Sequence, residues 1–346
     1  MKPRTRPRPW AAVIAAAALP VCCVPAPVFA AVALPAPGRY LPTPIPPVRL
    51  SGITAVSAGD DFALALRTDG TVVGWGADRF GQSSLARRLR GITAISAGRD
   101  FGIALRTDGT VVGWGNNEHG KASPPRWLTG VRSISAGAEW ALAVRWDGTV
   151  VGWGDDRFRE VSSARRLSGI ILASASDRFG IALRTDGRVV GWGNDEFRKS
   201  RPPRWLSGVR DVSTGGIFAL ALRWDGTLVG WGADDFRQVS IANRISGLRQ
   251  VSGGDRFVAA LRWDGTAFGW GRNEFGQARP PRWARGIIQL SAGNDFVVAV
   301  RTDGTVLEWG NVGGPGQPAE VGSGSTGAAG GAGGASGDGG SGSGGD

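Results

Sequence analysis

GITAVSAGDDFALALRTDGTVVGWGADRFGQSSLARRLR, residues 52–90, is the first of seven copies of one 39-residue unit. Its Trp-Gly step returns at a spacing that never varies, at Trp75, Trp114, Trp153, Trp192, Trp231, Trp270 and Trp309. Its Asp-Gly step returns in the same way, at Asp69, Asp108, Asp147, Asp186, Asp225, Asp264 and Asp303. A period this regular over residues 52–310 indicates one repeat array rather than two ordinary domains.

Each unit contains three short runs that favour β-strands. In the first unit they cover residues 53–58, 62–68 and 71–76, and Asp69-Gly70 between the last two is a strong signal for a tight hairpin. The second and third runs are therefore expected to pair as antiparallel neighbours. Helical repeats of similar length are excluded, because Gly, Thr and Val dominate and no ten-residue stretch keeps a 3.6-residue period.

The second run of each unit is apolar on both faces. Ala63 and Ala65 alternate with Leu64 and Leu66, so one face is small and the other is large. Sheets of this kind stack around an axis, with the large face of one against the small face of the next. Seven copies predict an all-β fold, a seven-bladed β-propeller, with the Trp of each Trp-Gly step in the core.

The ends of the array indicate how the ring closes. The last unit stops at Trp309-Gly310 without the connector that follows the other six, whereas residues 46–52 match the connector at residues 124–130. The N-terminal segment is therefore expected to supply the missing connector and to pack beside the seventh blade, which removes exposed sheet edges. The predicted propeller, including this closing segment, spans residues 41–311.

The flanking segments differ in composition from the array. Residues 1–30 have a basic start, an apolar stretch and a Val-Phe-Ala ending, which is typical of a signal peptide. A membrane anchor is the alternative, but prolines interrupt the run and it is shorter than a spanning helix needs. Residues 31–40 form a Pro-rich lead-in, and residues 312–346 are Gly- and Ser-rich and expected to be disordered. The expected location is secreted or in the cell envelope, with no membrane span in the mature chain.

Composition limits the chemistry that is open to the mature chain. Both cysteines, Cys22 and Cys23, lie in the leader, so disulfides, thiol catalysis and cysteine metal sites are excluded after cleavage. The formal net charge of +11 falls to +7 when the four basic leader residues are removed. Only three of the forty basic residues are Lys, many Arg stand beside Asp, and an exported chain seldom meets nucleic acid. We expect a monomer that binds no nucleic acid and no cofactor.

The motifs resemble those of a known repeat family. GITAISAG followed by FGIALRTDGTVVGWGNNEHG is similar to the bacterial short form of the regulator-of-chromosome-condensation (RCC-type) repeat, and the exported, cysteine-free version is similar to type II β-lactamase inhibitory protein. The resemblance covers residues 52–310 and implies a β-propeller. In the inhibitor, the residue two places before the Ala-Leu-Ala-Leu run is often aromatic; here it is Asp61, Asp100, Glu139, Arg178, Ile217, Arg256 or Asp295. This departure disfavours inhibition of a β-lactamase.

Few residues offer catalytic or metal chemistry. His119, the only histidine, stands in a connector where most units have Phe, so it is interpreted as a replacement for a packing aromatic residue. Glu308 stands where six units have Gly; it is either a general acid or sugar-binding carboxylate, or, as we prefer, an edge charge allowed by incomplete packing. The Asp-Gly steps lack the alternate ligands of a calcium loop. We expect neither an enzyme nor a metal site.

A second period of 78 residues marks the candidate binding residues. Connectors after units two, four and six carry Trp127, Trp205 and Trp283, whereas those after units one, three and five carry Arg88, Arg166 and Arg244 at the same position; Arg49 completes the set. Three hairpins carry Trp146, Trp224 and Trp263 in place of Thr. Chain direction places connector ends and Asp-Gly turns on one rim, so these residues are expected to meet there.

Three interpretations of this rim remain open. Trp and Arg are the residues most enriched in interface hot spots, which favours binding of a protein partner, such as a secreted enzyme. Exposed aromatic rings also suit the stacking of glycan rings from the cell envelope. Alternatively, the tryptophans cap the outer ends of the blades, with Arg covering the ring faces. We expect a non-enzymatic binding protein with a protein partner, and a glycan as the second possibility.

Overall fold

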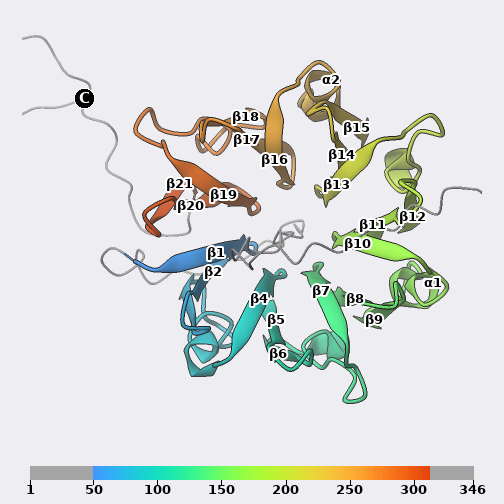
Figure 1. Cartoon of the computed structure of the whole chain (residues 1–346), viewed down its shortest axis with the longest axis vertical. Helices are drawn as coiled ribbons and strands as arrows, with labels where there is room; N and C mark the ends of the chain where they lie inside the picture. The colour runs from blue at the N-terminus through green and yellow to red at the C-terminus, as the bar shows by residue number, and fades with distance from the viewer. Residues whose placement is uncertain (1–49, 312–346) are drawn as a thin grey trace, which may run out of the picture. The chain divides into compact units, whose positions relative to one another are not determined.

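The computed structural model describes residues 50–311, which form seven three-stranded antiparallel sheets arranged around a central axis (Figure 1). Each sheet comes from one repeat and each is a blade, so the predicted all-β, seven-bladed propeller is confirmed. The signal peptide, the Pro-rich lead-in, residues 41–49 of the closing segment and the Gly-rich tail lie outside the described residues. Within those residues, no helix is long and apolar enough to cross a membrane.

The strands recur with nearly constant bounds. Blades one to four contain β1 (Ile53–Ala58), β2 (Phe62–Arg67), β3 (Val72–Gly76), β4 (Ile92–Ala97), β5 (Phe101–Arg106), β6 (Val111–Gly115), β7 (Val131–Ala136), β8 (Trp140–Arg145), β9 (Val150–Gly154), β10 (Ile170–Ala175), β11 (Phe179–Arg184) and β12 (Val189–Gly193). Blades five to seven contain β13 (Val209–Thr214), β14 (Phe218–Arg223), β15 (Leu228–Gly232), β16 (Leu248–Gly253), β17 (Phe257–Arg262), β18 (Ala267–Gly271), β19 (Ile287–Ala292), β20 (Phe296–Arg301) and β21 (Val306–Gly310). Two connectors also form short helices that the sequence did not predict, α1 (Glu160–Ala164) and α2 (Gln238–Ala242).

The Asp-Gly turns have a local cause that repeats around the ring. Asp69 Oδ1 accepts hydrogen bonds from the Thr71 amide at 2.9 Å and the Thr71 hydroxyl at 2.6 Å, while Gly70 takes the positive φ of 74° that the turn requires. These side-chain hydrogen bonds are the largest cause that lowers the pKa of Asp69. The turn therefore uses the carboxylate itself, in agreement with the interpretation that it is not a calcium ligand.

The blades stack by their unequal faces. The first strands lie nearest the axis and contact the first strands of the neighbouring blades (Figure 1). Leu64 and Leu66 of the first blade pack with Ala97 and Ala104 of the second, which is the predicted contact of a large face with a small one. The Trp of each Trp-Gly step is buried, with at most 8% of its surface exposed.

A ladder of serine hydroxyls joins every blade to the next. The Ser57 hydroxyl accepts the Ala97 amide at 2.9 Å, and Ser291 of the seventh blade accepts the Ala58 amide at 3.0 Å, which closes the ring. The ring-closing side also contains Leu50, which is buried in a cluster with Phe296 and residues of the first blade. Of the predicted closing segment, Leu50 and Ser51 are the described residues, and Leu50 packs where the prediction places it.

Candidate binding surface

The two ends of the blades form two distinct rims. The hairpin rim carries the Asp-Gly turns, and the opposite rim carries the turns between the first and second strands of each blade. The Gly70 carbonyl accepts the Ile92 amide at 3.0 Å, so each hairpin meets the strand that follows the next connector. Connector ends and Asp-Gly turns therefore share the hairpin rim, as chain direction predicts.

All six predicted rim tryptophans are exposed to solvent. The exposed fractions are 67% for Trp127, 71% for Trp146, 65% for Trp205, 76% for Trp224, 67% for Trp263 and 55% for Trp283. The Trp146 amide donates to the Gly130 carbonyl at 3.0 Å, which places this hairpin against the connector end that bears Trp127. The six rim tryptophans thus lie at the surface, whereas the tryptophans of the Trp-Gly steps lie in the core.

Arginine side chains cover one face of four of these rings. Guanidinium carbons lie over ring centroids at 5.3 Å for Arg132 on Trp146, 5.4 Å for Arg210 on Trp263, 5.5 Å for Arg223 on Trp205 and 6.0 Å for Arg301 on Trp283. Within residues 50–311, the ring-to-ring contacts are Trp140 with Trp192 and Phe268 with Trp270, so the rim tryptophans do not stack on one another. The expected cation-π cover is present, yet more than half of each ring remains exposed.

The arginines of the predicted alternation are exposed as well. Arg88, Arg166 and Arg244 lie in connector ends on the hairpin rim, in the positions that Trp127, Trp205 and Trp283 take in the other connectors. Arg49 is outside the described residues. Around the described part of the ring, the rim therefore presents alternating aromatic and cationic side chains.

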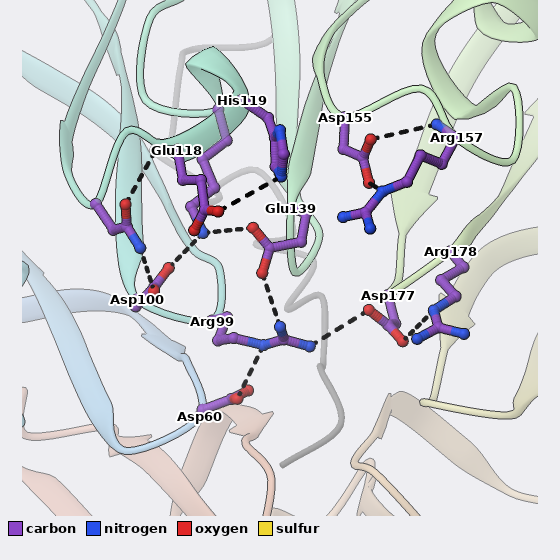
Figure 2. Close-up of polar contacts among 12 residues, drawn as sticks. Asp60, Arg99, Asp100, Glu118, His119, Glu139, Asp155, Arg157, Asp177 and Arg178 are labelled. Atoms are coloured by element: carbon purple, nitrogen blue, oxygen red, sulfur yellow. Dashed lines mark hydrogen bonds and ion pairs between the residues drawn. The ribbon is translucent and has the colours of Figure 1, made fainter. Parts of the chain in front are cut away.

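A network of charged side chains from several blades lies on the opposite rim. Arg99 lies between three carboxylates, at 2.7 Å from Glu139, 3.4 Å from Asp177 and 3.6 Å from Asp60 (Figure 2). Burial is the largest cause that raises the pKa of Asp60 well above its ordinary value, and Arg99 opposes the shift. These side chains come from the first four blades, so the network ties blades together at the axis rather than leaving a free charged surface.

Lys121 extends this network into the protein interior. Its side chain is fully buried, and its ammonium lies 2.7 Å from an Asp100 oxygen and 2.6 Å from a Glu139 oxygen. Sequence reasoning missed this cluster because its members are 18 to 21 residues apart and belong to no motif.

The opposite rim also carries partly exposed aromatic residues, at the position that His119 takes in the second unit. The exposed fractions are 39% for Phe80, 37% for Phe158, 52% for Phe197 and 47% for Phe275, and arginine side chains lie over the rings of Phe80, Phe158 and Phe275. His119 itself is exposed, takes a φ of 57° and lies 3.7 Å from Glu118. Sequence reasoning missed this second aromatic set, although its 39-residue spacing was visible.

Glu308 acts at the contact between the last and first blades. Its carboxylate accepts the indole N–H of Trp75, whereas the other six Trp-Gly indoles donate to a connector carbonyl 32 residues earlier, such as Gln82 for Trp114. Burial raises the pKa of Glu308 to about 7, opposed by the hydrogen bond from Trp75. The carboxylate interpreted as an edge charge is therefore partly buried and hydrogen-bonded at the contact between two blades.

We expect Glu308→Gln to raise stability at pH 8 and to have a smaller effect at pH 5. The pKa of Glu308 is higher in the folded state than in the unfolded state, where it is about 4.3. The contribution of this group to stability is therefore fully present below a pH of about 4.3 and is lost as pH rises through about 7. Removing this titration should stabilise the protein by roughly 2 kcal/mol at the higher pH. Thermal unfolding at both pH values measures the effect. Glu118→Gln, on an exposed side chain, is the control, and a variant without pH dependence relative to wild type would contradict the expectation.

Comparison with known proteins identifies the repeat. A model of the "Regulator of chromosome condensation (RCC1) repeat" family matches residues 53–82, 92–121, 170–198 and 248–277. The matches cover the first, second, fourth and sixth blades, and the remaining blades have the same three strands at the same spacing. Four of the seven blades of this β-propeller therefore carry repeats that match the RCC1 family model.

Solved structures show the same fold at low sequence identity. The propeller is similar to human WBSCR16, with 17% identity, a TM-score of 0.60 and coverage of 73% of this chain and 88% of that one. It is similar to Prp20p of Saccharomyces cerevisiae, with 16% identity, a TM-score of 0.59 and coverage of 75% and 84%. It is also similar to the CRINKLY WD40 ectodomain of the Arabidopsis thaliana receptor kinase ACR4, with 20% identity, a TM-score of 0.59 and coverage of 75% and 98%. A search of curated proteins found no match.

Proposed function

We propose that this propeller is an exported, non-enzymatic scaffold that binds another protein through its hairpin rim. The observation that carries the proposal is the set of six exposed tryptophans on one rim, among exposed arginines. Large exposed aromatic side chains are costly to leave in water, and Trp and Arg are the side chains that contribute most to protein interfaces. Prp20p, a structural neighbour, is described with binding properties to Gsp1p and histones, which is consistent with a protein-binding role for a propeller of this kind.

The chemistry of the site favours binding over catalysis. Within residues 50–311, no group of three or more His, Cys, Asp or Glu side chains is arranged to hold a metal. The causes that shift the pKa of Glu308 are burial and Trp75, with no second carboxylate among them, so the pair required for glycoside hydrolysis is not evident there. Arginine on one face of four rim tryptophans also reduces the ring surface open to a sugar, which supports a protein partner over an envelope glycan.

A capture experiment with secreted and envelope proteins tests the proposal. Replacing Trp127, Trp205 and Trp283 by Ala should reduce capture roughly tenfold or more, because hot-spot side chains dominate binding energy. The matched control replaces Phe80, Phe158 and Phe275 by Ala on the opposite rim, and this variant should capture as wild type does. Equal capture by both variants and wild type would contradict the proposal. Quenching of Trp fluorescence by cell-wall glycans, lost in the first variant, would instead favour the glycan alternative.

A further inference from the structure

The connector ends on the hairpin rim carry an excess of positive charge. The described connector ends, residues 87–91, 126–130, 165–169, 204–208, 243–247 and 282–286, contain ten arginines and no acidic residue, and all ten arginines are exposed. In the described part of the chain, Arg145 with Asp147 is the one ion pair recorded on this rim, and the other twelve contacts lie on the opposite rim. The two rims therefore differ in how many of their charged side chains form ion pairs.

A groove of about 480 Å³ opens on this rim at the fourth blade. It lies between the Asp186-Gly187 hairpin and the connector end, and its lining includes Arg188, Pro202, Pro203, Arg204 and Trp205. Arg223 is not one of the lining residues, but its guanidinium carbon lies 5.5 Å from the centroid of the Trp205 ring. An apolar floor of Pro and Trp with guanidinium groups at its edge matches the size and polarity of ligand sites in proteins.

Arg188 distinguishes this groove from the other hairpins. The other six hairpins have Thr at the corresponding position, where its hydroxyl bonds the turn aspartate, as Thr71 does with Asp69. In the fourth blade only the Arg188 amide bonds Asp186, at 3.0 Å, and the Arg188 side chain is exposed at the groove. The turn does not use the Arg188 side chain, which lines the groove together with Arg204 and Trp205.

The groove is suited to a ligand with a few separately placed carboxylates rather than to a uniformly charged polyanion. Guanidinium groups bind carboxylates through paired N–H donors, and stacking on Trp205 restrains the Arg223 plane. The turn aspartates recur between the arginines all around the rim, and hydrogen bonds from Thr lower the pKa of Asp69, Asp108, Asp147, Asp225, Asp264 and Asp303, so these groups stay ionised. A uniformly charged polyanion would meet these carboxylates at every blade, whereas a peptide can place its carboxylates selectively.

We infer that the groove beside Trp205 binds an acidic polypeptide segment of the protein partner, with Arg188 and Arg204 as its carboxylate ligands. The inference rests on the proposed function and deepens it, because it assigns the partner a chemistry. An apolar side chain of the segment packs on Trp205 and the two prolines, and neighbouring Asp or Glu side chains reach the guanidinium groups.

Fluorescence anisotropy with the full chain tests the inference. The probes are a short labelled Glu-rich peptide, the same peptide with Gln for Glu, a DNA oligonucleotide and polygalacturonate. The Glu peptide should bind most tightly, and the double change Arg188→Thr and Arg204→Ala should weaken it about tenfold or more. Arg188→Thr restores the residue of the other six hairpins, so the fold is preserved. Arg126→Ala, in the same Pro-Pro-Arg-Trp motif of the second blade, is the control and should weaken binding less.

The outcomes separate this inference from the proposed function. Three results would overturn the inference that an acidic segment binds here. They are equal binding of the Glu and Gln peptides, no binding of either peptide, and unchanged binding of the Glu peptide by the double variant. Tighter binding of DNA or polygalacturonate than of the Glu peptide overturns the peptide class. If the Trp127, Trp205 and Trp283 variant loses protein capture while the double variant keeps it, the rim function stands and the inference fails. If neither variant loses capture, the proposed function itself fails.

Discussion

Lys121→Met should destabilise the protein by about 3 to 5 kcal/mol, the cost typical of removing one partner from a buried ion pair. Lys121 is fully buried, and its ammonium is the shared partner of Asp100 and Glu139, at 2.7 and 2.6 Å. Met keeps the length and apolar stem of the side chain, so the loss reports the missing ammonium rather than a cavity; it falls mainly on Asp100, because Glu139 keeps Arg99 at 2.7 Å. Denaturant unfolding near neutral pH measures it.

Lys199 supplies a control within the same fold. It lies 78 residues later, is 3% exposed and contacts Phe179 as Lys121 contacts Phe101. The positions equivalent to Asp100 and Glu139 are occupied there by Arg178 and Ile217, and burial lowers the pKa of Lys199. Lys199→Met should therefore be close to neutral or stabilising. Equal destabilisation by the two changes would show that packing of the lysine stem, and not charge compensation, is responsible.

Gly191→Ala should cost about 3 kcal/mol or more, because it introduces a methyl group where no space exists. A Cβ at Gly191 would overlap the carbonyl oxygen of Ser200, which belongs to the connector folded back over the strand. The backbone carbonyl cannot move without displacing the connector that leads to Trp205. Thermal unfolding measures the effect on the fold.

Gly152→Ala is the matched control for this change. The same position in the third blade is covered by α1 at a greater distance, and the nearest atom to an added Cβ is the Val161 Cα at 3.2 Å. We expect a loss of less than about 1 kcal/mol, since Ala also favours a strand over Gly. A loss as large as that of Gly191→Ala would contradict the role assigned to the Ser200 carbonyl.

The scaffold was readable from sequence because its causes are local and repeated. A hairpin at Asp69-Gly70, alternation of Ala and Leu, and one Trp per period are sufficient to predict strands, faces and blade number. The rim tryptophans were placed on the correct end by chain direction alone. Their exposure required the structure, because a Trp in a loop is equally compatible with a capping role.

The missed features depend on contacts between blades. Ser57 and its six equivalents were visible at 39-residue spacing, but the amide that each hydroxyl accepts lies in the next blade, 40 residues away for Ser57 and 233 for Ser291. Lys121 reads as an ordinary surface lysine until Asp100 and Glu139 are brought to it. The groove at Arg188 depends on the fold of one connector over one hairpin, which no periodicity describes.

The serine ladder has a consequence for where the polypeptide may begin. The contact between the seventh and first blades repeats the Ser-to-amide bond of every other contact and the hairpin bond of most of them, with the Gly304 carbonyl accepting the Ile53 amide at 3.1 Å. Within residues 50–311 no strand is exchanged between the first and last repeats, and this junction differs from the others in that the Trp75 indole donates to Glu308 rather than to a connector carbonyl. A circularly permuted chain that starts at another connector would retain the same inter-blade bonds.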